Sequence, residues 1–382
     1  MKHKNDEDKR MPQKWVSCDI EAEYFKDDRK HSRMERKLAS AKDRSKYKKT
    51  DRDKQEKNKG LHQNIKVPEE DLLQGRVLSI TPQGFVVEHE KARYTCTIRG
   101  LLKKEKTQFK NLVTVGDIVL FQKTHQAEGL IAHIQPRKSI LSRADNLSRR
   151  QEQLIAANID LVLITVSVVN PPIKPSLIDR YIIAARKGGM QPVIVVNKID
   201  LLNEETSLSE KEIYHQLIEA YKTVSVPVIT ASVVNEHGLD ELKNTMKDKA
   251  SVFSGQSGVG KSSLINAITG HSLKVGKVVD RTKKGSHTTT KAQLIPLEFG
   301  GWCIDTPGIK SFGVWNLQKA EVEQYFSEIY EIGHRCKFPD CSHTHESDCA
   351  VLEAAEKGEL SHLRLDSYHF LLEELSQEHM RR

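Results

Sequence analysis

The sequence lacks any hydrophobic run long enough to cross a membrane. Its longest apolar stretch covers residues 161–169, whereas a membrane-spanning helix needs about 20 consecutive apolar residues. The N-terminus also lacks the apolar core and small-residue cleavage site of a secretory leader. We therefore expect a cytoplasmic protein without a membrane partner.

Cysteine is scarce, with six in 382 residues. Cys18, Cys96 and Cys303 are isolated, whereas the other three lie close together near the C-terminus. A disulfide-stabilised protein would carry cysteines spread along the chain in pairs, so this distribution argues against that class. It indicates one local metal site instead.

Large apolar residues are sparse in residues 1–66, which hold 21 Lys or Arg against 13 Asp or Glu. This surplus equals the net charge of the whole chain, +8, so the rest of the sequence is neutral. The arm cannot offset its ordering entropy by burial, and we expect it to be disordered in isolation. It is either a solvated tail without a partner or a salt-sensitive electrostatic tether to a polyanion such as RNA.

Residues 67–142 alternate apolar and polar positions, with turn signals between the runs. The predicted strands are 75–80, 85–89, 93–98, 117–122 and 130–134. Five short strands in so few residues favour a small closed barrel of the OB type, a fold that often binds nucleic acid. Another small five-stranded barrel would give the same pattern.

From about residue 151 the pattern changes to fully apolar runs separated by longer helical segments. The predicted strands are 161–166, 192–196, 226–230 and 252–254, with 292–299 and 302–305 as a hairpin at the edge of the same sheet. The predicted helices are 178–187, 210–221, 239–247 and 261–269. Runs of this kind are typical of a parallel sheet covered by helices on both faces. Beyond residue 315 the spacing predicts helices over 319–332, 350–357 and 360–374, with a cysteine-rich loop between the first two.

A glycine-rich segment with the spacing of a phosphate-binding loop follows the apolar run at 250–253 and opens a predicted helix. Its residues are Gly255, Gln256, Ser257, Gly258, Val259, Gly260, Lys261 and Ser262, followed by Ser263. Glycines let backbone N–H groups converge on phosphates, Lys261 would reach the β and γ phosphates, and the Ser262 hydroxyl would bind Mg²⁺. The strand before it and the helix after it are the context that such a loop requires.

Two further motifs of a guanine-nucleotide site lie upstream of this loop. Asn197, Lys198 and Asp200 end a predicted buried strand, where the Asp200 carboxylate can accept two hydrogen bonds from guanine. Adenine lacks that donor pair, so ATP would leave a buried carboxylate unpaired. Thr230, Ala231 and Ser232 form the second motif.

Two more motifs lie downstream of the loop. Asp305 follows an apolar strand, where it can bind Mg²⁺ through water, and the Gly308 N–H can contact the γ phosphate. Thr289 is the expected magnesium ligand of a first switch segment, with Thr288 as the alternative. The expected GTP-binding residues are therefore Asn197, Lys198, Asp200, Thr230, Ala231, Ser232, Gly255 to Ser263, Thr288, Thr289, Asp305 and Gly308, and the expected magnesium ligands are Ser262, Thr289 and Asp305.

The base-recognition motifs precede the phosphate-binding loop, which is the reverse of the usual order. This order predicts a circularly permuted GTPase domain that binds GTP or GDP with Mg²⁺. In this arrangement the second switch, residues 308–313, leads directly into the C-terminal helices, so nucleotide state could reposition them.

The residue that would orient the attacking water is not evident in the second switch. Many GTPases place Gln directly after the glycine of that motif, and here the position holds Ile309. His287 is the nearest motif residue with suitable chemistry, as a water-orienting group or weak general base. The alternative is that His287 only packs or contacts RNA. We expect slow hydrolysis by the free protein and faster hydrolysis when a partner orders residues 277–290.

Cys336, Cys341, His343 and Cys349 offer three thiolates and one imidazole within a short loop. Four such ligands suffice for one closed, tetrahedral, structural Zn²⁺ site. His345 is a competing imidazole, and His334 is a more distant one. Unliganded thiols are the alternative reading.

These motifs together resemble the ribosome small-subunit-dependent GTPase A family. The similarity covers about residues 70–375 and includes Ile155 to Asp160, the motifs above, His287 to Thr290, Phe312 to Trp315 and the Cys/His cluster. The resemblance implies a multidomain α/β protein with an N-terminal OB-fold β-barrel (67–142), a central circularly permuted P-loop GTPase domain (143–317) and a C-terminal zinc-binding helical domain (318–382). The basic arm, 1–66, exceeds what most members carry.

The resemblance also implies a partner and an activity. It points to late maturation of the 30S ribosomal subunit, docking on 16S rRNA near the decoding region, and GTP hydrolysis stimulated by that subunit, and we expect the protein to act as a monomer. The family's switch usually carries arginine before the histidine, whereas this chain has Ser286. Two other hypotheses are an RNA-binding protein whose nucleotide site only switches affinity, and a permuted GTPase that serves the large subunit.

Overall fold

The computed structural model describes residues 71–98, 112–144, 152–202, 208–270, 292–305 and 317–380. The first five strands form a closed barrel: β1 (Leu73–Ile80), β2 (Phe85–His89), β3 (Ala92–Ile98), β4 (Ile118–His125) and β5 (Glu128–Ile134). β1 pairs antiparallel with both β2 and β4, and β3 pairs parallel with β5, which completes the ring. Alternate side chains such as Val77, Val87 and Phe121 point inward and are fully buried. The strands predicted from alternation are therefore confirmed, and they form the expected five-stranded barrel.

The central sheet has the strand order β10-β9-β8-β11-β13-β12. These strands are β8 (Leu161–Ser167), β9 (Gln191–Asn197), β10 (Val228–Thr230), β11 (Ala250–Ser254), β12 (Gln293–Pro296) and β13 (Trp302–Asp305). All neighbours are parallel except β12, which runs antiparallel to β13. The carboxyl ends of β8, β9, β10 and β11 therefore meet at one edge of the sheet.

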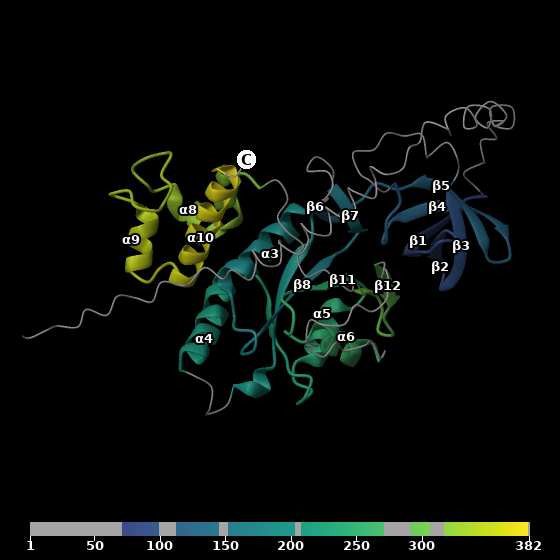
Figure 1. Ribbon diagram of the computed structural model, residues 1–382, viewed down its shortest axis with the longest axis horizontal. Coiled ribbons are helices and arrows are strands. Elements are labelled where there is room, and N and C mark those ends of the chain that lie inside the picture. The colour runs from purple at the N-terminus through teal and green to yellow at the C-terminus, as the bar shows by residue number, and fades with distance from the viewer. Residues whose placement is uncertain are drawn as a thin grey trace, which may run out of the picture. The chain divides into compact units, whose positions relative to one another are not determined.

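Helices cover both faces of this sheet (Figure 1). α3 (Pro175–Lys187) and α4 (Leu208–Thr223) pack on one face, and α5 (Leu239–Met246) and α6 (Lys261–Thr269) pack on the other. Alternation along β8 divides its side chains between the two layers. Val162 joins the core under α3, whereas Leu161 and Leu163 join the core under α5 and α6. Burial on both faces is the reason that these strands read as continuous apolar runs.

The sequence predicted that the hairpin β12–β13 forms an edge of the sheet, and the structure contradicts this. Gln293 of β12 pairs with Ser79 of β1, so the barrel continues the central sheet. The guanidinium of Arg76 also lies 4.2 Å from the ring centre of Trp302, whose Nε1 donates to Glu88 Oε2 at 3.0 Å. The edge prediction was wrong because a separate part of the chain covers the strand, which periodicity within one segment cannot reveal.

A two-stranded sheet links the barrel to β8 and was not predicted. It consists of β6 (Ile140–Ala144) and β7 (Glu152–Ala157). Asn158, directly after β7, has a positive φ of 54°, and its Nδ2 donates to Gly116 O at 3.0 Å. This connection therefore also contacts the barrel.

The C-terminal helices are α7 (Lys319–Val322), α8 (Ser327–Gly333), α9 (Ala350–Glu356) and α10 (His362–Met380). The single helix predicted over 319–332 was wrong, because a 3₁₀ turn, η5 (Glu323–Tyr325), and the non-helical residue Phe326 separate α7 from α8. Phe326 is buried against Tyr368 of α10, with ring centres 5.5 Å apart. Tertiary packing of this ring thus overrides a helical spacing that continues through it.

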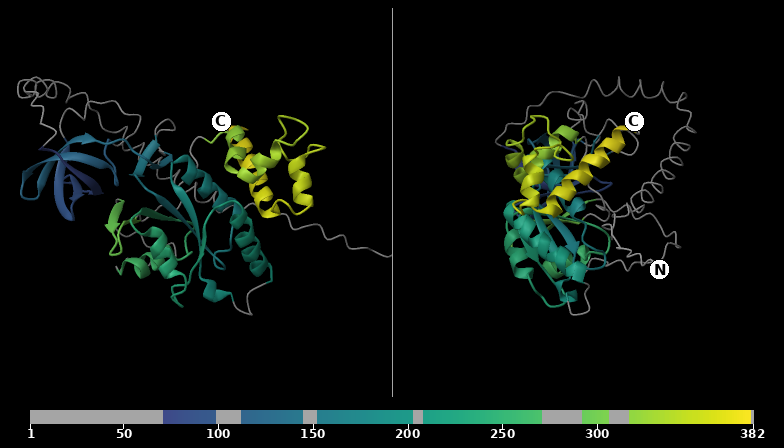
Figure 2. Two further views of the ribbon diagram at one scale, coloured as in Figure 1. Left: turned by 180° about the vertical axis from the view of Figure 1, so that it is seen from behind. Right: turned by 90° about the vertical axis from the view of Figure 1, so that its left-hand side faces the viewer.

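α10 lies beside α3 of the central domain (Figure 2). Arg180 of α3 pairs with Glu374 of α10, and the buried Asp179 pairs with Arg364.

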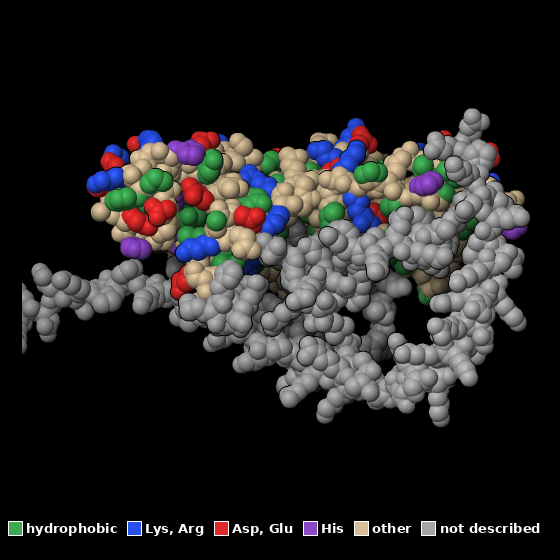
Figure 3. All heavy atoms as spheres, turned by 90° about the horizontal axis from the view of Figure 1, so that it is seen from above, with side chains coloured by type: hydrophobic (Ala, Val, Ile, Leu, Met, Phe, Trp, Pro, Cys, Tyr) green, Lys and Arg blue, Asp and Glu red, His purple; other side chains and the backbone are tan. Residues whose placement is uncertain are grey.

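Among the described residues, no helix has the length and apolar character that a membrane span would require. On the face drawn in Figure 3, Lys and Arg are interspersed with Asp and Glu over the described residues. Such mixing agrees with a basic surplus that belongs to residues 1–66.

Candidate nucleotide site and cysteine–histidine cluster

The glycine-rich loop stands at the carboxyl end of β11 and leads into α6, as predicted. Gly255, Gly258 and Gly260 all have φ values in the left-handed range. The Lys261 ammonium donates to two carbonyls of the loop itself, Gly255 O at 2.7 Å and Gln256 O at 2.6 Å. The lysine is therefore held against the concave backbone on which a phosphate-binding loop depends.

The upstream Asn-Lys-x-Asp motif contacts this loop directly. Asn197 ends β9, is 2% exposed, and donates from Nδ2 to Val259 O at 2.8 Å. Lys198, with a φ of 62°, donates from Nζ to Gly258 O at 2.6 Å and to Asn170 O at 2.7 Å. Burial lowers the pKa of Lys198, and the nearby Asp200 carboxylate opposes that shift. Segments some sixty residues apart in sequence are thus joined at one edge of the sheet.

Ser232 orients the carboxylate of Asp200. Its Oγ donates to Asp200 Oδ1 at 2.6 Å, and the strand that precedes it is in register with β9, since the Ala231 N–H donates to Val196 O at 2.8 Å. Because this hydrogen bond holds Oδ1, the orientation of the whole carboxylate, and so the position of Oδ2, is fixed. This is the geometry needed to accept a pair of N–H donors from a ligand.

The structure brings together the predicted residues from Asn197 to Ser263. The backbone of Asp305 ends β13, which pairs in parallel with β11 through Val252 and Ile304, so it reaches the same edge as the loop. Ser286, His287, Thr288, Thr289 and Gly308 lie outside the described residues.

Gly260 is the contact point between the loop and Asn197. It has a φ of 94°, and a Cβ placed there would lie 2.3 Å from Asn197 Nδ2. We expect Gly260→Ala to displace Asn197 and to weaken GTP binding at least about 10-fold, the equivalent of about 1.4 kcal/mol or one lost hydrogen bond. Calorimetric titration with GTP measures this. Gly270→Ala is the matched control, because Gly270 also has a positive φ but nothing lies within 4 Å of its Cβ position; equal affinities of the two variants would contradict the prediction.

Cys336, Cys341, His343 and Cys349 form a compact cluster between α8 and α9. Their four possible ligand atoms all lie within 4.8 Å of one another. His343 Nδ1 lies 3.5 Å from Cys336 Sγ and 3.4 Å from Cys349 Sγ. Three sulfurs and one imidazole nitrogen in this arrangement are compatible with a tetrahedral zinc site.

The chemistry of the cluster also favours a cation. Burial, followed by the neighbouring Cys349 and Cys336, raises the pKa of Cys341 to about 12. Three close thiolates would repel one another, and a divalent ion removes that repulsion. Of the alternative imidazoles, His345 is exposed and contacts Thr344 Oγ1 at 2.8 Å, and His334 packs edge-on against Tyr330. His343 therefore belongs to the cluster and the other two do not.

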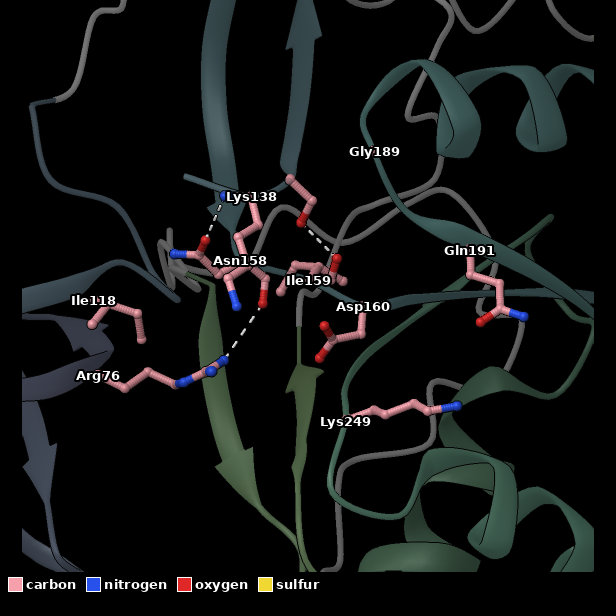
Figure 4. Close-up of a pocket in the computed structure, with 10 residues that line it drawn as sticks. Arg76, Ile118, Lys138, Asn158, Ile159, Asp160, Gly189, Gln191 and Lys249 are labelled. Carbon is pink, nitrogen blue, oxygen red and sulfur yellow. Dashed lines mark hydrogen bonds between the residues drawn. The ribbon is translucent and has the colours of Figure 1, made fainter. Parts of the chain in front are cut away.

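A hollow of about 380 Å³ lies at the amino ends of the central strands, opposite the end that carries the glycine-rich loop (Figure 4). Arg76 of the barrel, Asp160 before β8, Gln191 of β9 and Lys249 before β11 contribute to its lining. Burial lowers the pKa of Arg76, whereas the Asp160 and Glu88 carboxylates oppose that shift. Since it borders the amino ends of β8, β9 and β11, this hollow is separate from the nucleotide motifs.

Several residues of structural importance were not found from the sequence. Glu323 faces His343 from outside the Cys/His spacing, and Arg364 joins α10 to the central domain. The only signal for Arg364 in the sequence was an arginine between two leucines of a predicted helix. Glu323 gave no signal, because its partner depends on how η5 packs.

A barrel followed by a parallel sheet in which the base-recognition motif precedes the phosphate-binding loop defines a circularly permuted P-loop GTPase. The RsgA N-terminal domain matches residues 74–131, and the RsgA GTPase domain matches residues 134–315. The Small ribosomal subunit biogenesis GTPase RsgA of Flavobacterium psychrophilum is 37% identical over 308 residues, which cover 79% of this chain and 93% of that protein. The chain belongs to the RsgA GTPase family and is a GTP-hydrolysing enzyme.

Two solved structures agree with this assignment. YjeQ from Thermotoga maritima superposes with a TM-score of 0.63 at 31% identity, covering 80% of this chain and 98% of that one. YloQ, described as a circularly permuted GTPase, gives a TM-score of 0.63 at 27% identity, covering 83% and 98%. The permuted fold inferred from motif order is therefore confirmed.

Proposed function

We propose that this chain is a GTPase of small ribosomal subunit biogenesis that binds 16S rRNA in the 30S subunit and hydrolyses GTP to GDP and phosphate when the subunit stimulates it. The observation that carries the proposal is the direct contact of Asn197 and Lys198 with the phosphate-binding loop. It is supported by relatives named as small ribosomal subunit biogenesis GTPases. The protein works in the cytoplasm as a monomer.

In this proposal Asp200, oriented by Ser232, accepts the guanine N–H pair, and Lys198 lies along the base. The backbone of Gly255 to Gly260 holds the phosphates, and Lys261 leaves its own loop carbonyls to pair with them. Ser262, Thr289 and Asp305 would hold Mg²⁺, which would supply positive charge beside the phosphates. Such a site rejects adenine because Asp200 would then be left without its two donors.

The Cys/His cluster holds one structural Zn²⁺ in the same proposal. The ion contributes no chemistry to hydrolysis, since a closed four-ligand site leaves no open position. It fixes the loop between α8 and α9, which lies next to α10. The barrel and the basic arm, residues 1–66, supply rRNA contacts, with the domains divided at about residues 142 and 317.

The test is hydrolysis of GTP titrated with purified 30S subunits. We expect slow turnover by the free chain and a rise of at least about 10-fold at saturation, equivalent to about 1.4 kcal/mol of transition-state stabilisation. Purified 50S subunits are the matched control and should not accelerate turnover. Binding to 30S without acceleration would favour an RNA-binding switch, and acceleration only by 50S would favour a large-subunit GTPase; either result contradicts the proposal.

His287 is the proposed water-orienting residue. His287→Ala should lower the 30S-stimulated rate of GTP hydrolysis about 10²-fold or more. Its affinity for GTP and its binding to 30S should stay unchanged. Single-turnover hydrolysis with 30S present separates this from a contact role, which would lower binding instead. A variant that hydrolyses GTP at the wild-type rate would exclude the assignment.

A further inference from the structure

The two ring nitrogens of His343 face different partners. Nδ1 faces the thiols of Cys336 and Cys349. Nε2 is fully buried and makes no hydrogen bond within the described residues, but it lies 3.4 Å from Glu323 Oε1. If Nδ1 binds a metal ion, the ring proton must reside on Nε2. That proton then points at the carboxylate of Glu323.

We propose that Glu323 is the positioning residue of the metal site, which accepts the Nε2–H of His343 and thereby fixes the tautomer and the plane of the ring. The proposal rests on the zinc site proposed above. A metal ion on Nδ1 makes the Nε2–H a stronger donor, so the contact with a carboxylate becomes a charge-assisted hydrogen bond. Zinc binding and the contact between η5 and the cysteine loop therefore strengthen each other.

The packing at Gly333 is built around this contact. A Cβ at Gly333 would lie 2.8 Å from Glu323 Oε1 and 3.2 Å from His343 Nε2. Only glycine leaves room for both groups to approach each other at the end of α8. A side chain at Gly333 would therefore crowd the Nε2 edge of the buried His343 ring and displace the carboxylate of Glu323.

The backbone of His343 is held as well as its ring. Its φ is 59°, a left-handed conformation that costs a non-glycine residue free energy. His369 of α10 donates from Nε2 to His343 O at 2.6 Å. With the carbonyl held by α10 and the ring held by η5, His343 is presented to the thiols in one orientation, which lowers the entropy lost when it binds the metal.

Glu323 lies well before the first cysteine and outside any recognisable ligand spacing. It belongs to η5, which the buried Phe326 separates from α8. The break in the predicted helix thus has a second consequence. It turns Glu323 toward the cluster and connects the start of the C-terminal helices to the metal site.

The experiment compares zinc affinities of full-length variants by competition with a chromophoric chelator. We expect Glu323→Ala to bind zinc about 10–100-fold more weakly than the unmodified chain, and Glu323→Gln, which keeps an acceptor oxygen, to fall between them. Gly333→Ala should weaken binding without changing any charge. Glu331→Ala is the matched control, because Glu331 is an exposed glutamate of α8, and it should bind zinc normally.

A second readout separates positioning from ligation. The absorption spectrum of the Co²⁺-substituted protein should keep the intensity of a three-sulfur, one-nitrogen site in Glu323→Ala, since no ligand is lost. If the wild-type chain binds one zinc and Glu323→Ala binds it as tightly as Glu331→Ala does, this inference alone is overturned. A wild-type chain that binds no zinc would overturn the proposed metal site together with it. Circular dichroism of Glu323→Gln checks that the fold is kept.

Discussion

Asp200→Asn is expected to weaken GTP binding at least about 100-fold and to create a preference for xanthosine triphosphate. Each hydrogen bond to a charged group contributes about 1.5–3 kcal/mol, and the substitution removes the charge and replaces one of the two acceptor oxygens by a donor. Ser232 decides the outcome in this structure, because it donates to Asp200 Oδ1. An asparagine keeps that bond through its own oxygen, so its NH₂ group takes the place of Oδ2 and faces the base.

The NH₂ group repels the guanine N–H donors but matches the additional carbonyl of xanthine. Calorimetric titration of each variant with GTP and with xanthosine triphosphate measures the change. Asp366→Asn, at an exposed position on α10, makes the same chemical change away from the motifs and should leave both affinities unaltered. An Asp200→Asn chain that still prefers GTP would show that Asp200 does not read the base.

Arg364→Ala is expected to destabilise the protein by about 3–5 kcal/mol, because it leaves a buried carboxylate without its counter-charge. Arg364 is 2% exposed and contacts Asp179 of α3 and, at 2.6 Å, Glu328 of α8. Burial opposes its charge, but Asp179, Tyr221 and Glu328 together hold the pKa of Arg364 above its ordinary value. The guanidinium therefore stays charged and ties three helices together.

Chemical denaturation of the full chain measures this loss. Lys337→Ala removes an ion pair with Asp348 in which both side chains are 62% exposed, and its unfolding midpoint should not change, since surface pairs contribute little. Adding Asp179→Asn to Arg364→Ala should recover part of the stability by removing the unpaired charge. A double variant less stable than Arg364→Ala would contradict the buried-charge explanation.

Short-range sequence patterns were sufficient to predict a structural element wherever its conformation depends on residues of the same segment. The strand alternation of the barrel, the apolar strands of the central sheet and the glycine spacing of the phosphate-binding loop all depend on neighbours in sequence. The order of the motifs was also enough to predict the permutation, because the ends of parallel strands must meet at one edge. The roles of His287, Thr289 and Gly308 remain predictions.

Patterns failed where two distant segments compete for one conformation. The helix predicted over 319–332 breaks at Phe326, since burying that ring against α10 outweighs continued helical hydrogen bonding. The predicted edge of the sheet is covered by β1 for a similar reason. Periodicity reports which face of a segment is apolar, but it does not say which part of the chain covers that face.

The amino-acid sequence alone determined which reactive groups this protein offers: a glycine-rich loop with the spacing of a phosphate-binding loop, the carboxylate of an Asn-Lys-x-Asp motif, and three thiols close to an imidazole. Residue type and local spacing specify these, because each motif folds mainly through its own backbone. Tertiary structure confirmed the predicted His343 over its competitors, and it alone decided that Glu323 lies beside the imidazole and that Ser232 orients Asp200. Those choices depend on contacts between elements far apart in the chain, whose free energies appear only once the helices and strands have packed.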